Sequence, residues 1–433
     1  MGTGVMIGAG VFALMGQVAG AGTGGRWFPV AFLAAALNAQ RSRRTRTRQS
    51  CRTRSRRRAG ISMFLNQAYS VGPIAATFTM AMWASMILNE SLVARTFGTY
   101  FTKLIGVDSS TAAVAGLGVA LLLGSFAINA AGNKAVNDVE RVMAIIKIGG
   151  LVVFAGACLW VADFPATKPG ATDAPTLDSL IAAVGIGLLA YKGFTTITNT
   201  GAEIEEPTKN VGRAIMISIA IVTVVYLAVA LAVRGNLGLG QIMDARDFAL
   251  AEAAAPVFGS VGFKLVAGLA VIATVTSVMA SMYSTSRMLG MMSDMDEVPT
   301  VDDRVTFGRR IPIGSPSLVV TTASAIFLTV TLDLMRIAAL GAFAYLALDM
   351  VIHFGHLRHL RDQTGARSAP LVAAIVVDAV VFAGFFVYRV RTDLLVIAAF
   401  LVFAVVVAGG ETLYMRRFSS TDGSIEEDDK IEN

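Results

Sequence analysis

The chain has 433 residues, of which 55% are hydrophobic and 15% are charged, and its mean hydropathy is +0.65. A soluble protein averages about 25% charged residues, so the polar surface is too small to cover soluble globular domains. The formal net charge of +6 depends on ten arginines within residues 41–58, because without them 26 basic residues stand against 30 acidic ones. We therefore predict an all-α polytopic membrane protein, since the apolar segments are long and continuous rather than alternating as in barrel strands.

The apolar segments divide the chain into candidate membrane spans, each of which needs about 20 residues. One stretch, residues 27–37, is only half a span because the arginines follow it, so we expect about 12 spans with the second one broken. Basic residues are more frequent at one set of loop ends, which predicts that those ends and both termini are cytoplasmic. The acidic tail, residues 419–433, is expected to be disordered. The other candidate spans are residues 4–20, 72–100, 111–131, 139–162, 178–203, 211–233, 260–286, 316–332, 337–355, 368–388 and 393–414.

Two of these spans carry glycine-containing interruptions. The first span has Gly4, Gly8 and Gly10, and each glycine weakens a helix by about 1 kcal/mol. Such glycines either allow close helix packing or mark a break whose free backbone groups bind a ligand. The span 178–203 is interrupted in the same way by residues 190–194, which read AYKGF. Interruptions at corresponding positions of two halves indicate a transporter binding site, and here they fall in the first and sixth spans, as a five-plus-five inverted repeat requires.

These segments resemble a known family. Residues 6–12 read MIGAGVF, residues 203–215 read EIEEPTKNVGRAI, and residues 141–150 of the fifth span contain Lys147. Together with residues 190–194 they resemble the amino acid permeases of the amino acid–polyamine–organocation superfamily. The resemblance implies a leucine-transporter-type fold with discontinuous helices 1 and 6. Its transporter domain would span residues 1–418, with repeats at about 1–162 and 178–355 and two extra spans at 368–414.

The resemblance also implies a substrate site at the two breaks. A half-helix N-terminus presents free N–H groups and a partial positive charge, which suit a carboxylate. Free carbonyls at the other half-helix suit an ammonium. The first break would therefore hold the substrate carboxylate, while the second would complete the pocket and its gate. The residues implied are Ile7, Gly8, Ala9, Gly10, Tyr191, Gly193 and Phe194.

Lys147 is the candidate for ion coupling. A lone lysine in the fifth span either extends to the cytoplasmic surface or faces the interior of the bundle. Proton-coupled permeases of the family that this chain resembles can carry a fifth-span lysine whose ammonium occupies a sodium position. That position would lie between the first-span break and the eighth span, where Thr274, Thr276 and Ser277 offer hydroxyls. Burial disfavours the charged lysine, so we predict proton-driven, sodium-independent transport.

Other ionisable residues lie within the spans, where they are functional candidates by default. Glu90 is expected to pair with Arg95 near the extracellular end of its span. Asp349 and Asp378 are interpreted as structural or water-facing. Lys192 lines the pocket or extends to the membrane surface, and the sequence does not distinguish the two.

The three histidines of the chain, His353, His356 and His359, are spaced three residues apart. This spacing is compatible with a metal on one helix face, but the neighbouring arginines favour an interfacial charge cluster. We therefore expect no metal site. No P-loop, nucleophile elbow or zinc-binding His–Glu helix is visible, so we expect neither an enzyme nor an ATP-driven pump, and no cofactor.

The arginine-rich segment, residues 41–58, cannot cross a bilayer, because each arginine costs roughly 2.5–3.5 kcal/mol at its centre. Three interpretations compete: a basic loop that binds anionic lipid, a nucleic-acid patch, and translation of a shifted reading frame. We favour the third, because re-reading the codons permits a sequence similar to the end of the second span in these permeases. The first half-helix is also shorter than the resemblance implies. A start codon assigned too late and a true loss of residues would both give this result. Resequencing the locus would test the frameshift.

The sequence therefore predicts a secondary active transporter of amino acids or related amines in the cell membrane. Its partners would be the substrate, protons and the lipid bilayer, and not nucleic acid. Two alternatives remain at this stage. One is a membrane receptor or sensor that binds substrate without transporting it, and the other is a non-functional product of a frameshifted gene.

Overall fold

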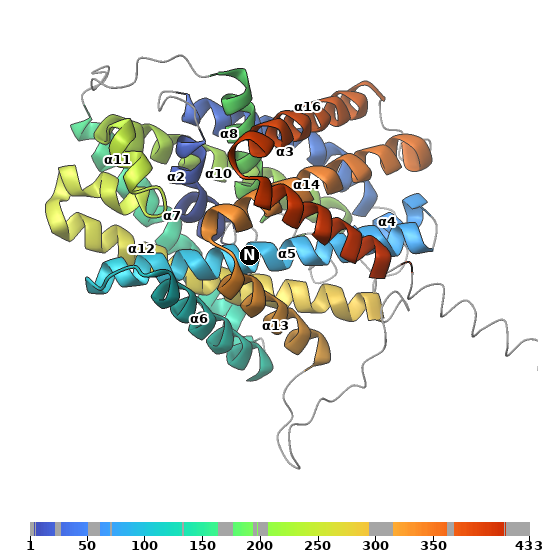
Figure 1. The fold of residues 1–433 in the computed structure, drawn as a ribbon, viewed down its shortest axis with the longest axis horizontal. Helices are drawn as coiled ribbons and strands as arrows, with labels where there is room; N and C mark the ends of the chain where they lie inside the picture. The colour runs from blue at the N-terminus through green and yellow to red at the C-terminus, as the bar shows by residue number, and fades with distance from the viewer. Residues whose placement is uncertain are drawn as a thin grey trace, which may run out of the picture.

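The computed structural model describes residues 4, 6–21, 27–50, 61–69, 72–131, 134–162, 176–193, 197, 207–293, 315–361, 368–410 and 412. All regular elements within these residues are helices, gathered into one bundle (Figure 1). They are η1 (Ile7–Val11), α2 (Phe12–Gly20), α3 (Phe28–Ser50), α4 (Ile61–Tyr69), α5 (Pro73–Ile105), α6 (Thr111–Ala131), α7 (Lys134–Val161), α8 (Leu177–Ala190), α10 (Pro207–Asn236), α11 (Leu239–Asp244), α12 (Ala249–Ser293), α13 (Pro316–Thr331), α14 (Leu334–Gly355), η3 (His356–Leu360), α16 (Ser368–Thr392) and the helix Leu394–Gly410.

The helices confirm the predicted all-α membrane architecture. Each predicted span contains a helix within the described residues, although α8 covers only the first part of the predicted span 178–203, and the short helices α4 and α11 were not predicted. Six of the described helices are long and apolar enough to cross a membrane, and they lie within α6, α7, α10, α12, α14 and α16. Helix α3 continues through residues 41–50 of the arginine-rich segment, while residues 51–58 of that segment and the acidic tail 419–433 lie outside the described residues.

The outer surface of the bundle is apolar. Trp160 at the end of α7 is 91% exposed, and Ile145 and Val153 on the same helix are also largely exposed. A soluble monomer rarely presents such a continuous apolar surface to water. The exposed side chains therefore face lipid, while polar side chains such as Lys147 and Asp378 are buried inside the bundle.

Glycine and proline set the ends and bends of the long helices. Helix α5 begins with Pro73 in its first turn and ends at Gly106, whose φ of 73° is left-handed, as is common for a helix C-terminus. Helix α12 contains Pro256 and bends at Gly259, where φ is 63°. The eighth span therefore begins after Gly259, which agrees with its predicted start at residue 260.

Three helices surround the first-span motif. The π-helix η1 contacts α12, α5 and α8, which are the eighth, third and sixth spans. Helices α5 and α12 lie against each other and cross the middle of the bundle (Figure 1). Helix α3 packs against α10 and α8. The first-span motif thus contacts the sixth span, which was predicted to complete the substrate site, and the eighth span, which was predicted to border the ion position.

Candidate functional site

The first-span motif is a π-helix. Residues Ile7–Val11 form η1, and α2 continues from Phe12. A π-turn widens the backbone hydrogen-bonding pattern and occurs frequently at functional sites. The irregularity predicted at this position therefore takes the form of a π-turn, while residues 1–3 and 5 before it lie outside the described residues.

Gly8 and Gly10 are positions of close helix approach. A Cβ atom at Gly8 would overlap the Ser277 side chain and lie 2.8 Å from the Ala273 carbonyl oxygen on α12. A Cβ atom at Gly10 would overlap the Tyr226 hydroxyl and lie 2.5 Å from the Ala190 carbonyl oxygen. The structure therefore confirms close helix packing at both glycines. A role of the same backbone in binding a ligand stays a prediction.

The sixth-span interruption lies directly against the first span. Helix α8 ends at Ala190, and Tyr191, Lys192 and Gly193 form a turn. A Cβ atom at Gly193 would lie only 2.7 Å from the Met6 backbone nitrogen. Phe194, the remaining predicted pocket residue, lies outside the described residues. The structure thus brings together the two glycine-containing segments, which are almost 190 residues apart in the sequence.

Tyr226 joins the two interruptions and was missed in the sequence. Its hydroxyl, on α10, lies 2.6 Å from the Met6 carbonyl oxygen and 3.2 Å from the Ala190 carbonyl oxygen. Its ring packs against Tyr191, with the ring centroids 5.2 Å apart. Tyr191 in turn donates a hydrogen bond to the Phe32 carbonyl on α3 at 3.2 Å. A buried tyrosine hydroxyl usually needs a hydrogen-bond partner. A tyrosine within the apolar span 211–233 was therefore the sequence signal that could have indicated a polar contact inside the bundle.

Lys147 faces the interior of the bundle. Its side chain is 0% exposed, and its Nζ donates to the Gly4 carbonyl oxygen at 3.3 Å. Ser277 on α12 donates to the same oxygen at 3.0 Å. The alternative in which Lys147 extends to the membrane surface is therefore wrong.

The two threonines near Ser277 point elsewhere. Thr276 donates within its own helix, with its hydroxyl 2.9 Å from the Ile272 carbonyl oxygen. Thr274 likewise donates to the Ala270 carbonyl oxygen at 2.8 Å. Among the three predicted hydroxyls, only Ser277 has a hydrogen bond to the first span in the described structure. A coupling role for Thr276 stays a prediction that these contacts do not support.

Lys192 also lies inside the bundle. It is 2% exposed, and its Nζ donates to the backbone oxygen of Ser85 at 2.5 Å and to the Ser85 hydroxyl at 2.7 Å. The open question about Lys192 is thus answered, because a side chain that reached the membrane surface would not make these contacts. The sixth-span turn is attached to α5, the third span.

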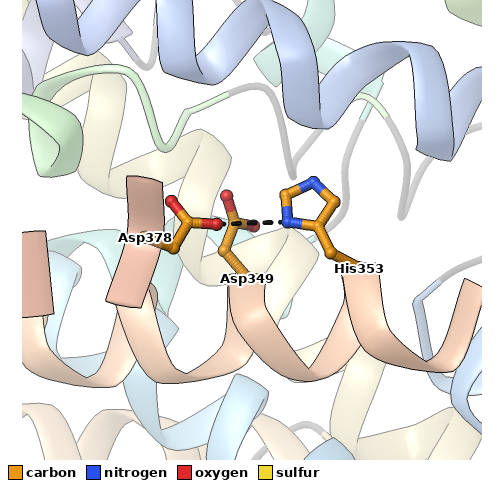
Figure 2. A group of neighbouring side chains, drawn as sticks. All are labelled: Asp349, His353 and Asp378. Atoms are coloured by element: carbon orange, nitrogen blue, oxygen red, sulfur yellow. Dashed lines mark hydrogen bonds and ion pairs between the residues drawn. The ribbon is translucent and has the colours of Figure 1, made fainter. Parts of the chain in front are cut away.

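The structure corrects the prediction for the histidines and leaves one of the two alternatives for the aspartates. Asp349, His353 and Asp378 are buried and lie together between α14 and α16 (Figure 2). The prediction of an interfacial histidine cluster is therefore wrong for His353, which pairs with Asp378 at 3.1 Å, and for the buried His356. The two aspartates are buried, so the water-facing alternative is wrong and the structural alternative remains. Only His359 is exposed, and its ring lies 6.0 Å from the Tyr69 ring.

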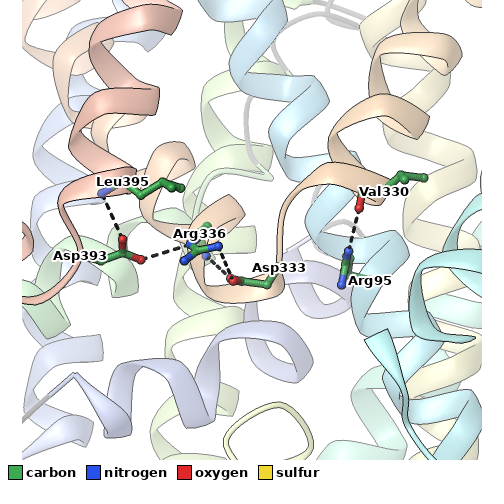
Figure 3. A network of polar contacts seen from close by, with 6 residues as sticks. All are labelled: Arg95, Val330, Asp333, Arg336, Asp393 and Leu395. Atoms are coloured by element: carbon green, nitrogen blue, oxygen red, sulfur yellow. Dashed lines mark hydrogen bonds and ion pairs between the residues drawn. The ribbon is translucent and has the colours of Figure 1, made fainter. Parts of the chain in front are cut away.

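The predicted pairing of Glu90 with Arg95 is also wrong. Arg95 donates to the Thr329 carbonyl oxygen at 2.8 Å and to the Val330 carbonyl oxygen at 3.4 Å, at the end of α13 (Figure 3). Glu90 and Arg95 are five positions apart on one helix, which is more than one helical turn, so they point in different directions. Glu90 is completely buried, and its helix packs on α12, which carries Thr285 beside the Glu90 side chain.

A polar network next to Arg95 fixes the loop ends on this side of the bundle. Arg336 pairs with Asp393 at 3.2 Å and with Asp333 at 3.5 Å, and the Asp333 side chain accepts from the Arg336 backbone N–H. Figure 3 shows this network joining the start of α14 to the turn after α16. These ion pairs are partly exposed, and exposed ion pairs contribute little stability. Their role here is to connect neighbouring loop ends, and they lie outside the two interruptions.

Known proteins with similar sequences identify the family of this chain. Residues 1–417 match the amino acid permease family. The chain is 29% identical over 386 residues to an uncharacterized protein of Methanocaldococcus jannaschii, covering 88% of this chain and 86% of that protein. It is 24% identical to the inner membrane transport protein YbaT of Escherichia coli, covering 89% and 87%. It is 26% identical to the serine/threonine exchanger SteT of Bacillus subtilis over half of each chain. The chain therefore belongs to the amino acid permease family, whose members are transporters rather than enzymes.

Proposed function

We propose that this permease is a proton-driven secondary transporter of amino acids or related amines. It would lie in the cell membrane with both termini cytoplasmic, as the excess of basic residues at one set of loop ends indicates. The observation that carries the proposal is the position of Lys147, whose Nζ lies 3.3 Å from the Gly4 carbonyl oxygen. An ammonium group buried between the fifth span, the first span and α12 can hold these elements together when protonated and release them when neutral.

The proposed substrate site is formed by the backbone of the two interruptions. The first-span residues Ile7, Gly8, Ala9 and Gly10 would bind the substrate carboxylate through backbone N–H groups. The sixth-span residues Tyr191, Gly193 and Phe194 would bind the ammonium through carbonyls and close the pocket. The contact of Gly193 with Met6 supports this proposal, because it brings the two backbones together. A relative named as a serine/threonine exchanger supports small neutral amino acids as the first substrates to test.

The coupling cycle follows from the contacts of Gly4. Its carbonyl oxygen accepts from both Lys147 and Ser277, so a protonated lysine supplies a charge-assisted hydrogen bond of the stronger kind. Burial disfavours the charged lysine when this partner moves away. Opening of the first span and release of the proton would therefore favour each other, which is the linkage that coupled transport needs.

Uptake of radiolabelled amino acids into proteoliposomes tests the proposal. We expect an inward proton gradient to stimulate uptake several-fold in sodium-free buffer. Lys147→Ala should remove this stimulation, since the variant lacks the group that binds the proton. Lys264→Ala, at an exposed position of α12, is the matched control and should keep it. A requirement for sodium, or a full pH dependence in Lys147→Ala, would contradict proton coupling.

The same assay tests the arginine-rich segment. A frame-restored chain, in which residues 41–58 are replaced by the shifted reading, is measured beside the chain as it stands. Uptake by both proteins would contradict the hypothesis that residues 41–58 arise from a frameshift that inactivates the protein. Binding without uptake in both proteins would favour the receptor alternative.

A further inference from the structure

A buried cluster of metal-ligating side chains lies outside the proposed substrate site. Asp349 and His353 belong to α14 and Asp378 belongs to α16 (Figure 2). Asn38 on α3 donates a hydrogen bond to Asp378 at 2.6 Å. The cluster thus joins the second, tenth and eleventh spans, whereas the proposed substrate site lies at the interruptions of the first and sixth spans. Transport of the substrate does not account for these residues.

The geometry of the cluster suits the binding of one cation. One ligand atom from each of Asp349, His353 and Asp378 lies within 4.8 Å of the other two. The His353 Nδ1 and Asp378 Oδ2 atoms are 3.1 Å apart. Bonds of about 2.0–2.2 Å to a tetrahedral metal place its ligands about 3.4 Å from one another. The 3.1 Å separation is close to that of a metal site, and the separations of up to 4.8 Å would need to shorten by no more than about 1.4 Å to complete the geometry.

The spacing on α14 supports the same conclusion. Asp349 and His353 are four residues apart and therefore lie one above the other on the same face of the helix. The helix presents both side chains toward α16, whose Asp378 supplies the third ligand (Figure 2). Two ligands at this spacing on one helix and a third from a neighbour form a rigid set, because each helix is fixed by its own packing.

Asn38 adds an independent observation. Its side chain is 3% exposed, and its Oδ1 atom has no hydrogen-bond partner among the described residues. The two ends of an asparagine amide are assigned from hydrogen bonding rather than observed directly. Rotation of the Asn38 amide by half a turn would present this oxygen to the cluster as a fourth ligand. In that orientation the Asn38 oxygen would lie beside the Asp378 carboxylate, and two oxygens placed so closely are favourable only with a cation or a proton between them.

We propose that Asp349, His353 and Asp378 bind one divalent transition-metal cation, with Asn38 completing the site. An imidazole with two carboxylates suits Zn²⁺ or Mn²⁺, whereas Mg²⁺ and Ca²⁺ prefer oxygen ligands alone. The ion would balance the charge of two carboxylates that are buried beside each other. It would also hold α16, outside the proposed inverted repeat, against α14 and α3 within it.

Metal binding by the complete, tag-free chain in detergent tests this proposal. After chelator treatment and dialysis, the protein is titrated with Zn²⁺, and bound metal is counted by mass spectrometry. Co²⁺ absorption reports on the ligand set. We expect one Zn²⁺ per chain and a rise in the unfolding temperature. His353→Gln and Asp378→Asn should weaken Zn²⁺ binding at least tenfold, whereas His359→Gln, at the exposed histidine one turn and a half further on, should not change it.

The outcomes separate the possibilities. Absence of Zn²⁺ and Mn²⁺ binding at micromolar concentrations by the unmodified chain would overturn the proposal. Equal losses in His359→Gln and His353→Gln would also overturn it, because the metal would then lie at the surface. Since variants of buried residues can fail to fold, Asp349→Glu serves as a conservative check that should retain binding. None of these measurements depends on uptake, so their failure would leave the transport proposal standing.

Discussion

The two interrupted spans meet each other but are attached to the rest of the bundle in different ways. At the first span, two donors from neighbouring helices, Lys147 and Ser277, converge on one backbone oxygen, that of Gly4. At the sixth span, the turn itself supplies the donor, because Lys192 reaches out to both the backbone and the side chain of Ser85 on α5. The Gly4 oxygen keeps one hydrogen bond when either of its two donors is lost. By contrast, loss of the Lys192 ammonium removes both of its hydrogen bonds to Ser85.

This difference has a consequence for transport. Neutralising Lys147 leaves Ser277 in contact with Gly4, so the first span can loosen without losing its position. Neutralising Lys192 removes both contacts between the sixth-span turn and Ser85. We therefore propose a coupling role for the first-span attachment and a positioning role for the sixth-span attachment, and the following experiments compare the two.

The largest effects are expected from adding a methyl group at either interruption. In Gly8→Ala the new Cβ would overlap Ser277 and approach the Ala273 backbone, and in Gly193→Ala it would approach the Met6 backbone. Overpacking of this kind costs about 1–3 kcal/mol. Gly8→Ala would push the first-span interruption away from α12, and Gly193→Ala would push the sixth-span interruption away from the first. We expect loss of substrate binding in both variants, measured as loss of substrate-induced thermal stabilisation.

Gly149→Ala on α7 is the matched control, since nothing lies within 4 Å of its added Cβ. It should bind substrate normally. Normal binding by Gly8→Ala and Gly193→Ala as well would show that neither close approach is needed for the site.

An intermediate effect is expected from Lys192→Met, which keeps the length of the side chain but removes the donor. Loss of both contacts with Ser85 should reduce the maximal uptake rate about tenfold, while the stimulation by a proton gradient stays the same. Lys264→Met is the exposed control. If Lys192→Met instead removed the gradient dependence, the sixth-span attachment would share the coupling role, and the distinction between the two regions would fail.

The smallest effect is expected from Ser277→Ala. Loss of one hydrogen bond costs about 1 kcal/mol, which corresponds to a change of about fivefold in the balance between attached and released first span. Thr276→Val is the neighbouring control, because its hydroxyl donates only within its own helix in the described contacts. The ratio of gradient-driven to passive uptake measures both. Equal changes in the two variants would argue against a specific contact of Ser277 with Gly4.

Much of the fold could be predicted from the sequence because the bilayer imposes strong rules. Apolar runs of about 20 residues must become helices, and each predicted span contains a helix within the described residues. The glycines of the first and sixth spans were identifiable because glycine is costly within a helix. By contrast, α4 and α11 are too short and too polar to produce such a signal.

The sequence by itself determined the membrane class, the helices, the family and the two segments that form the proposed site. Only the tertiary structure decided which side chains meet there. Thr276 and Ser277 are adjacent in the sequence but about 100° apart around the helix, so only the packing of α12 determines that Ser277 reaches Gly4. His353 was expected at the interface, but it is buried because α16 supplies Asp378, and Asn38 joins that cluster from 340 residues away. Hydropathy indicates which segments cross the membrane. The side chains that a given residue contacts depend on how its helix is rotated and which helices pack against it, and the local sequence does not determine either.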